Sequence, residues 1–316
     1  MGIVFSDIAV SADGFATGLD QREDAPFGDI DETWLHGWMF DTAEENRAEI
    51  DAIVAATKTA GFNLVELSLH DATAIDVPAA RQALADAGLG IVCSRGLAFD
   101  ADVSSADPAV VQRGSELLQT SLRLTHELGG RHFTGALYSA LGKYGQPLSA
   151  AGRANVVAVL QELAKDAAAL DMTLGLEVCN RYETNVINTA ADALRLADDI
   201  GADNVVIHLD TYHMNIEEDD LVRPVRLVGD RLGYVHIGEN HRGYLGSGHL
   251  DFSAFFHALA DIRYTGPITF ESFSSAVVSP TLSNDLAIWR NLWDDGPALA
   301  AHAHAYLVNA LKSAHA

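Results

Sequence analysis

Residues 171–210 read DMTLGLEVCNRYETNVINTAADALRLADDIGADNVVIHLD and contain one complete strand–helix–strand unit. The runs at 173–178 (TLGLEV) and 204–209 (NVVIHL) are short and β-rich, which predicts two buried strands. Between them, residues 190–200 (AADALRLADDI) space their apolar side chains as an amphipathic helix does. A strand, a helix and a second strand in this order predict parallel pairing, with the helix packed outside the sheet.

The same alternation extends outward from this unit, from residue 43 almost to the end of the chain. Further strands are predicted at 63–69, 89–94, 132–137, 233–237 and 267–271, with an eighth near the start at 3–10, and further helices at 108–128, 150–170 and 298–316. A doubly wound sheet would normally carry a glycine-rich phosphate turn after its first strand, and the sequence has no GxGxxG motif. We therefore predict an α/β fold of the (β/α)8 TIM barrel type.

The segment from 11 to 41 breaks this rhythm. It is rich in glycine and aspartate and shows no clear periodicity, and loops of such length are uncommon inside a compact domain. We predict two parts: an atypical N-terminal segment, 1–42, that supplies or replaces the first barrel strand, and a barrel that spans 43–316.

The charge balance excludes several classes of function. Of 316 residues, 44 are acidic and 20 basic, which gives a formal net charge of −24. Nucleic acids and anionic membrane surfaces are bound mainly through lysine and arginine, so we expect neither as a partner. No run of about 18 apolar residues exists to span a bilayer, and no basic, apolar leader opens the chain. We expect a cytoplasmic protein with reduced cysteines.

Acidic and imidazole side chains stand at the ends of four consecutive predicted strands. The segments GLEVCNRYET, VIHLDTYHMN, YVHIGENHRG and ITFESFSS contribute Glu177, Asp210, His236 and Glu271, respectively. Side chains alternate across a strand, so Glu177 shares a face with Gly175, while the intervening Leu176 faces the helices. Barrel active sites are assembled at the carboxyl ends of the strands, and the four side chains are expected there together.

Two glutamates, one aspartate and one histidine form an oxygen-rich ligand set. Such a set suits Mn²⁺, with Co²⁺ or Mg²⁺ as alternatives, better than a closed tetrahedral zinc site. Four protein ligands would leave two positions for substrate oxygens. Carboxylates on opposite sides of a substrate, here Glu177 and Glu271, are what a two-base proton exchange requires.

At these residues the chain resembles the ketose 3-epimerases that act on D-tagatose, D-allulose or L-ribulose, within the xylose isomerase-like barrels. The strings that carry the resemblance are LEVCNRYETNVINT, HLDTYHMNIEE, YVHIGENHRGYLGSGHLDF and FESFSSAVVSPTLSNDLAIWRNLW, within residues 50–295. It implies a metal held by Glu177, Asp210, His236 and Glu271, with Glu177 and Glu271 as the catalytic acid–base pair. It also implies a free ketose as substrate and a homodimer or homotetramer.

The resemblance further implies that Glu183, His213 and Arg242 bind the oxygens of substrate carbons 1 to 3. Taken alone, each has an ordinary reading: a solvated charge for Glu183, a neighbour of the ligands for His213, and a surface pair with Glu239 for Arg242. Among the remaining side chains, Glu66 matches a family position near the site without an assigned role. Phe273 and Tyr138 are readable either as core packing or as walls of the site.

Residues 1–41 depart from the family and resemble instead the opening of dihydrofolate reductase-like proteins, through DIAVSADGFATG, PFGD and LHGWMFD. The first barrel strand is then either supplied by 3–10 with an inserted loop or missing. Three alternatives to ketose epimerisation therefore stay open. They are an aldose–ketose isomerase, an inosose dehydratase of the same barrel group, and an inactive chimeric barrel.

Overall fold

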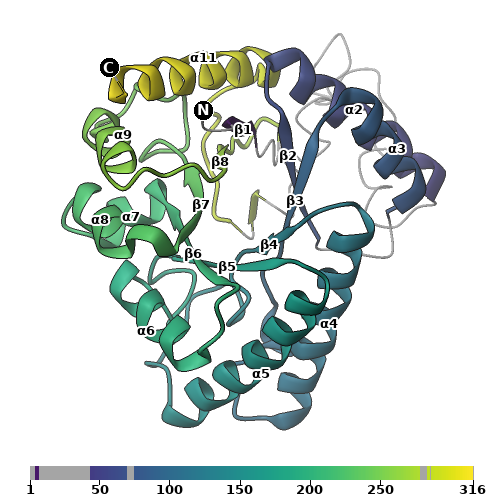
Figure 1. Cartoon of the computed structure of the whole chain (residues 1–316), viewed down its shortest axis with the longest axis vertical. Helices are drawn as coiled ribbons and strands as arrows, with labels where there is room; N and C mark the ends of the chain where they lie inside the picture. The colour runs from purple at the N-terminus through teal and green to yellow at the C-terminus, as the bar shows by residue number, and fades with distance from the viewer. Residues whose placement is uncertain (1–3, 7–42, 70–74, 278–282, 285, 316) are drawn as a thin grey trace.

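Eight parallel strands close into a barrel in the order β1 to β8, each paired with its neighbours in the chain (Figure 1). The computed structural model describes residues 4–6, 43–69, 75–277, 283–284 and 286–315. The strands are β1 (Val4–Ser6), β2 (Leu64–Ser68), β3 (Gly90–Ser94), β4 (His132–Thr134), β5 (Thr173–Glu177), β6 (Val205–Asp210), β7 (Leu232–Ile237) and β8 (Ile268–Phe270). The predicted (β/α)8 barrel is confirmed.

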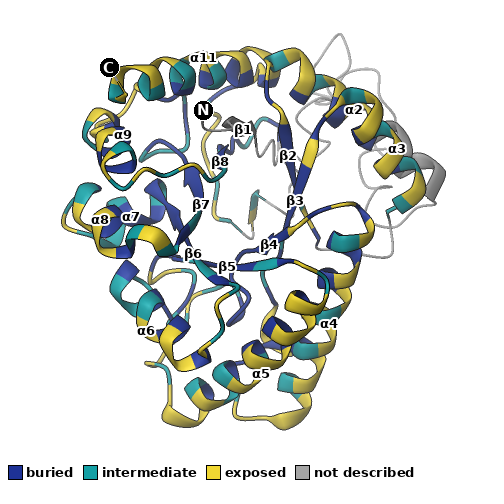
Figure 2. Ribbon diagram, in the orientation of Figure 1, coloured by how far each residue is buried: buried dark blue, intermediate teal, exposed yellow. Residues whose placement is uncertain are grey.

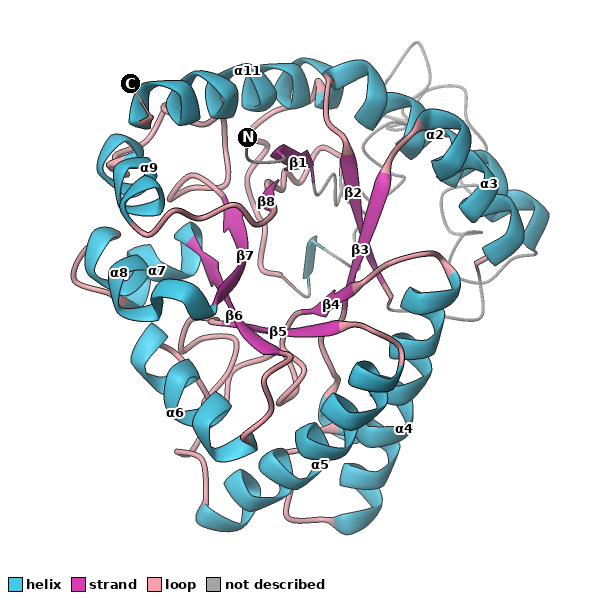
Figure 3. Cartoon of the chain, viewed as in Figure 1, coloured by secondary structure: helices cyan, strands magenta, loops and turns pink. Residues whose placement is uncertain are grey.

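Helices surround the ring of strands, as Figure 3 shows. They are α2 (Ala43–Ala60), α3 (Val77–Ala87), α4 (Pro108–Glu127), α5 (Ala150–Ala169), α6 (Ala190–Ile200), α7 (Thr211–Glu217), α8 (Val222–Val228), α9 (Phe252–Asp261) and α11 (Gly296–Ala314), with short 3-10 turns η2 (Phe99–Ala101) and η3 (Gly229–Arg231). The helix α11, which corresponds to the helix predicted at 298–316, packs against α2, α9 and β1 on the outside of the barrel (Figure 1). Within the described part of the chain, no helix combines the length and apolar character needed to cross a membrane.

The N-terminal predictions are tested only in part. Of the strand expected at 3–10, the structure describes Val4–Ser6, which lies between β8 and β2. The loop expected at 11–41, and the reductase-like strings within 1–41, lie outside the described residues apart from this strand. The division of the chain at residue 42 stays a prediction.

Local sequence signals fix the ends of the unit from which the fold was predicted. Helix α6 begins at a capping box, in which the Thr189 hydroxyl accepts from the Asp192 N–H and the Asp192 carboxylate accepts from the Thr189 N–H. It ends at Gly201, whose φ of 69° places it in the left-handed region that glycine tolerates. These two signals set the helix at the predicted residues 190–200.

The two faces of each strand have different surroundings. On β5, Leu174 and Leu176 are fully buried in the hydrophobic core that the strands share with the helices (Figure 2). The alternate face points into the barrel, where a Cβ on Gly175 would lie only 2.3 Å from the Thr134 hydroxyl oxygen. Glycine at this position therefore leaves room inside the barrel for polar side chains below Glu177.

Shortening an apolar side chain on the helix-facing side of β5 should destabilise the whole barrel. We expect Leu176→Ala to lower the free energy of unfolding by about 2–5 kcal/mol, because it removes apolar contacts and leaves a cavity. Urea denaturation of the metal-free protein measures the change. Leu227→Ala is the matched control: Leu227 is 56% exposed, so its truncation should cost less than about 0.5 kcal/mol. Equal losses in the two variants would contradict the assigned facing of β5.

Candidate active site

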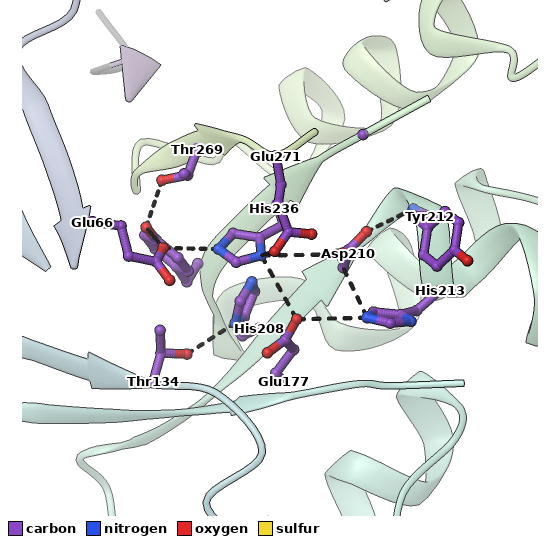
Figure 4. A network of polar contacts seen from close by, with 12 residues as sticks. Glu66, Thr134, Glu177, His208, Asp210, Tyr212, His213, His236, Thr269 and Glu271 are labelled. Carbon is purple, nitrogen blue, oxygen red and sulfur yellow. Dashed lines mark hydrogen bonds and ion pairs between the residues drawn. The ribbon is translucent and has the colours of Figure 1, made fainter. Parts of the chain in front are cut away.

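The register of the sheet brings the predicted site residues to one end of the barrel. Glu177 and Asp210 are the last residues of β5 and β6, His236 is the penultimate residue of β7, and Glu271 directly follows β8. Asp210 is paired with His236 across the β6–β7 ladder. Figure 4 shows the four side chains converging, with Glu177 and Glu271 approaching the His236 ring from opposite sides of the view.

The Nδ1 atom of His236 is the centre of this cluster. It lies 3.6 Å from Glu177 Oε1, 3.8 Å from Asp210 Oδ2 and 3.9 Å from Glu271 Oε1. These separations are too long for hydrogen bonds, and neither Nδ1 nor Asp210 Oδ2 has a hydrogen-bond partner among the described residues. Both atoms are buried, and buried polar atoms without partners are rare unless something else binds them.

The two oxygens of Asp210 have different surroundings. Oδ1 caps helix α7 by accepting a hydrogen bond of 2.6 Å from the Tyr212 N–H. Oδ2 faces the cluster, 3.7 Å from His213 Nε2 and 3.8 Å from Arg242. The cap therefore fixes the carboxylate and leaves one oxygen for the site.

The donor atoms fit a divalent cation. Asp210, His236 and Glu271 each offer a ligand atom, all within 4.8 Å of one another, and Glu177 forms a second such group with His208 and His236. Two ligands about 2.1 Å from one ion lie roughly 3–4 Å apart, which matches the spacings around Nδ1. Three carboxylates and one imidazole suit a hard or borderline ion. The described residues could hold a metal ion here.

His213 and Glu183 lie beside this cluster and share a partner. The Asn180 amide donates to His213 Nδ1 at 2.8 Å and to Glu183 Oε1 at 2.8 Å. Because Nδ1 accepts, the neutral ring carries its proton on Nε2, which lies 3.7 Å from Glu177 Oε1 and 3.9 Å from Glu183 Oε2. His213 thus presents an N–H donor to the site.

Arg242 is held by charge and by aromatic rings. Its guanidinium pairs with Glu271 and lies 3.7 Å from the centre of the Tyr212 ring and 5.1 Å from that of Phe273. The surface pair with Glu239 considered from the sequence is wrong. Glu239 is buried and accepts from the N–H groups of the loop that carries Arg242, at Asn240 and Gly246.

Burial and neighbouring charges set the protonation of the acids. Burial raises the pKa of Glu271 to about 7, although the charge of Arg242 opposes the shift. For Asp210, burial also raises the pKa, but His213, Arg242 and His236 lower it by more, so the net direction is downward. A carboxyl whose pKa lies near 7 can both accept and donate a proton near neutral pH.

A cavity of about 290 Å³ adjoins the cluster at the mouth of the barrel. Glu183, Tyr212, Arg242 and Phe273 are among its lining residues, so Phe273 forms part of a wall. Tyr138 instead is fully buried, and its hydroxyl donates to the backbone oxygen of Glu177 at 2.6 Å. The volume is close to the lower end of the range for small-molecule sites, about 300–1,000 Å³.

The seven predicted side chains are therefore brought together, and three of the contacts that hold them were not predicted. Asn180 orients His213, and Tyr212 stacks on Arg242. Glu66, which the resemblance placed near the site without a role, accepts a hydrogen bond from His236 at 2.8 Å. Asn180 and Tyr212 follow the ends of β5 and β6, so their position was a usable signal. Glu66 is a lone charge in the apolar run LVELSL, which was a second signal.

Comparison with known proteins gives first the class and then the family. Residues 54–307 match the family model described as xylose isomerase-like TIM barrel. A ketose 3-epimerase of Arthrobacter globiformis is 52% identical over 254 residues, which are 80% of this chain and 88% of that protein. An L-ribulose 3-epimerase of Methylomonas sp. strain DH-1 is 50% identical over 79% of this chain and 87% of that protein. The chain belongs to the ketose 3-epimerase family.

A solved structure agrees with this assignment. The D-allulose 3-epimerase of Methylomonas sp., crystallised in complex with D-allulose, superposes with a TM-score of 0.81 at 48% sequence identity. The match covers 83% of this chain and 91% of that one. The resemblance to the ketose 3-epimerases is confirmed, and the chain is an enzyme of the isomerase class.

Proposed function

We propose that this chain catalyses the metal-dependent epimerisation of free ketoses at C3. The observation that carries the proposal is the placement of Glu177 and Glu271 around His236 Nδ1, at 3.6 and 3.9 Å, from strands β5 and β8. Two acids that reach one small volume from different strands can act on opposite faces of a bound sugar. Similarity to ketose 3-epimerases over four-fifths of the chain supports the same reaction.

In the proposed reaction, one glutamate removes the proton at C3 of the ketose and leaves a cis-enediolate. The other glutamate returns a proton to C3 from the opposite face, which inverts that carbon. Each carboxyl thus changes its protonation state once per turnover, and proton exchange with solvent restores both before the next one. General acid–base catalysis of this kind is worth about 10²–10⁴-fold in rate.

Glu177, Asp210, His236 and Glu271 are proposed to hold the divalent cation. When bound, the cation supplies positive charge that polarises the ketone and stabilises the negative charge of the enediolate. We propose Mn²⁺, with Co²⁺ and Mg²⁺ as the alternatives, because three carboxylates and one imidazole favour these ions.

Glu183, His213 and Arg242 are proposed to bind the oxygens of carbons 1 to 3. His213 offers its Nε2–H, held in place by the hydrogen bond that Asn180 donates to Nδ1. Arg242 is always charged and offers several donors in a fixed plane, and Glu183 offers acceptors beside it at the cavity wall. Together they select a hydroxyl-rich substrate and fix C3 between the two glutamates.

The proposed substrates are the pairs D-fructose/D-allulose, D-tagatose/D-sorbose and L-ribulose/L-xylulose. The Methylomonas neighbour was crystallised with D-allulose, which supports a sugar of this class.

We also propose a homodimer or homotetramer in the cytoplasm. The buried free thiols of Cys93 and Cys179 suit a reducing compartment.

Product analysis tests the proposal against its alternatives. The protein is incubated with Mn²⁺ and D-fructose, D-tagatose or L-ribulose, and the products are separated and identified. We expect the C3 epimer of at least one ketose. An aldose would instead identify an aldose–ketose isomerase, a dehydrated product from an inosose would identify a dehydratase, and no conversion of any ketose would favour an inactive barrel.

Running the reaction in D₂O should place deuterium at C3. At equilibrium we expect nearly complete exchange of the C3 hydrogen in both epimers. The glutamate that removes this hydrogen as a proton exchanges the proton with solvent between turnovers. Proton NMR measures the loss of the C3 signal. The hydrogens at C1 are the internal control, since an isomerase would label C1. Retention of protium at C3 in both epimers at equilibrium would count against exchange of the transferred proton with solvent, and a base shielded from solvent would give the same result.

A further inference from the structure

Glu66 lies beside the proposed metal site but belongs to no role assigned so far. It stands in the middle of β2, is 1% exposed, and its Oε2 lies 2.8 Å from His236 Nε2 and 2.5 Å from the Tyr234 hydroxyl. Figure 4 shows it on the side of the His236 ring away from Asp210 and Glu177. The ring thus has a carboxylate on each side, with a different function expected for each.

The contact with Glu66 decides which nitrogen of His236 is free. A carboxylate only accepts hydrogen bonds, so the Nε2 atom must carry the proton and donate the hydrogen bond to Glu66. In the neutral ring the lone pair is then on Nδ1, the atom that faces Glu177, Asp210 and Glu271. The side of the ring that would bind a cation is therefore set by a residue 170 positions away in the sequence.

Glu66 is itself held in place. The Tyr234 hydroxyl donates to its Oε2 and lies 2.5 Å from the Thr269 hydroxyl, so side chains from β2, β7 and β8 form one connected group. The carboxyl is thus held by two hydrogen-bond donors, His236 Nε2 and the Tyr234 hydroxyl, in a position where an unpaired charge would be costly.

We propose that Glu66 is a positioning residue that fixes the ring orientation and the tautomer of His236 and increases its basicity toward the cation. This inference rests on the metal site of the proposed function. A carboxylate that accepts from Nε2 makes Nδ1 a better ligand, and loss of such a partner typically costs 10- to 100-fold in metal affinity or activity. Glu66 touches neither the substrate nor the reacting carbon in this proposal, so its effect passes through His236.

The test is the substitution Glu66→Gln, which keeps the shape of the side chain and removes its charge. Titration calorimetry of the metal-free protein with Mn²⁺ should give a Kd about 10- to 100-fold higher than that of the wild-type protein. At saturating Mn²⁺, kcat should fall while KM for the ketose changes less than twofold. The visible absorption spectrum of the Co²⁺-loaded protein should also shift, because a change in the basicity of His236 changes the ligand field of the ion. A merely structural role for Glu66 would leave that spectrum unchanged.

Asp102→Asn is the matched control. Asp102 is also a buried carboxylate that accepts from a tyrosine hydroxyl, that of Tyr144, at 2.6 Å, but it has no contact with His236 among the contacts described. Its neutralisation should leave the Kd for Mn²⁺ and the Co²⁺ spectrum unchanged. A loss of affinity equal to that of Glu66→Gln would overturn the proposal, because any buried neutralisation would then suffice.

The outcomes separate the inference from the function on which it rests. A wild-type protein that binds no Mn²⁺ would refute the metal site itself, whereas wild-type affinity in a folded Glu66→Gln protein would refute the role of Glu66 alone. If circular dichroism shows that Glu66→Gln does not fold, Tyr234→Phe replaces it, because that variant keeps the carboxylate and removes one of its donors. A raised Kd in Tyr234→Phe supports the proposal, and an unchanged Kd contradicts it.

Discussion

Glu177→Gln and Glu271→Gln should each reduce net epimerisation of the preferred ketose by about 10²–10⁴-fold. Glutamine keeps the size of the side chain and an oxygen toward the site, but it can neither take a proton from C3 nor give one back. The measurement is the initial rate of epimer formation at saturating Mn²⁺, with the metal content of each variant determined so that a lost ligand is not mistaken for a lost base.

The two variants should differ in a way that a shared structural defect cannot reproduce. Each retains one glutamate, so each can still exchange the C3 hydrogen of one epimer with D₂O, and the two variants should label opposite epimers. Glu218→Gln serves as the control, because Glu218 accepts from the Ala190 N–H at the start of α6, away from the ligands. Full epimerase activity in either Glu177→Gln or Glu271→Gln would end the two-base proposal.

The fold and the main site were predictable because both depend on local signals. Strand and helix positions follow from hydrophobic periodicity, and the caps at Thr189 and Gly201 set the ends of α6 within the chain itself. The facing of Glu177 follows from alternation along β5. Closure of a barrel then brings the carboxyl ends of all strands together, so residues as distant as Glu177 and Glu271 needed no further information to be placed in one site.

Two other features were not predictable because they depend on contacts between distant segments. The lone charge in the run LVELSL indicates that Glu66 is unusual, but its hydrogen-bond partner His236 lies 170 positions away, and no local signal identifies that partner. Arg242 adopts a φ of 62° in a loop held by Glu239, and loop conformation carries no periodic signal. The sequence therefore indicated which residues lie together in the candidate site, but not the contacts that orient them.

Removal of divalent cations should abolish turnover, and Mn²⁺ should restore it. The reason is the cluster itself: Asp210 Oδ2 and His236 Nδ1 are buried without a hydrogen-bond partner in the described structure, and Glu177 and Glu271 add negative charge around them. A bound cation would satisfy these atoms and stabilise the folded state, by about 2.7 kcal/mol at a concentration 100 times its Kd. The measurements are the epimerisation rate and the Tm after dialysis against a chelator, and again after addition of Mn²⁺, Co²⁺ or Mg²⁺.

The epimerisation rate and the Tm together distinguish a working metal site from metal binding without catalysis. Recovery of both rate and Tm identifies the cation as part of the working site, and the ion that restores the highest rate at equal occupancy is the best candidate for the native one. A rise in Tm without turnover of any ketose would instead indicate a barrel that retains metal binding and has lost catalysis. Undiminished turnover in protein shown by elemental analysis to be metal-free would contradict the metal site, because the charge of the enediolate would then have to be stabilised by Arg242 and His213 alone.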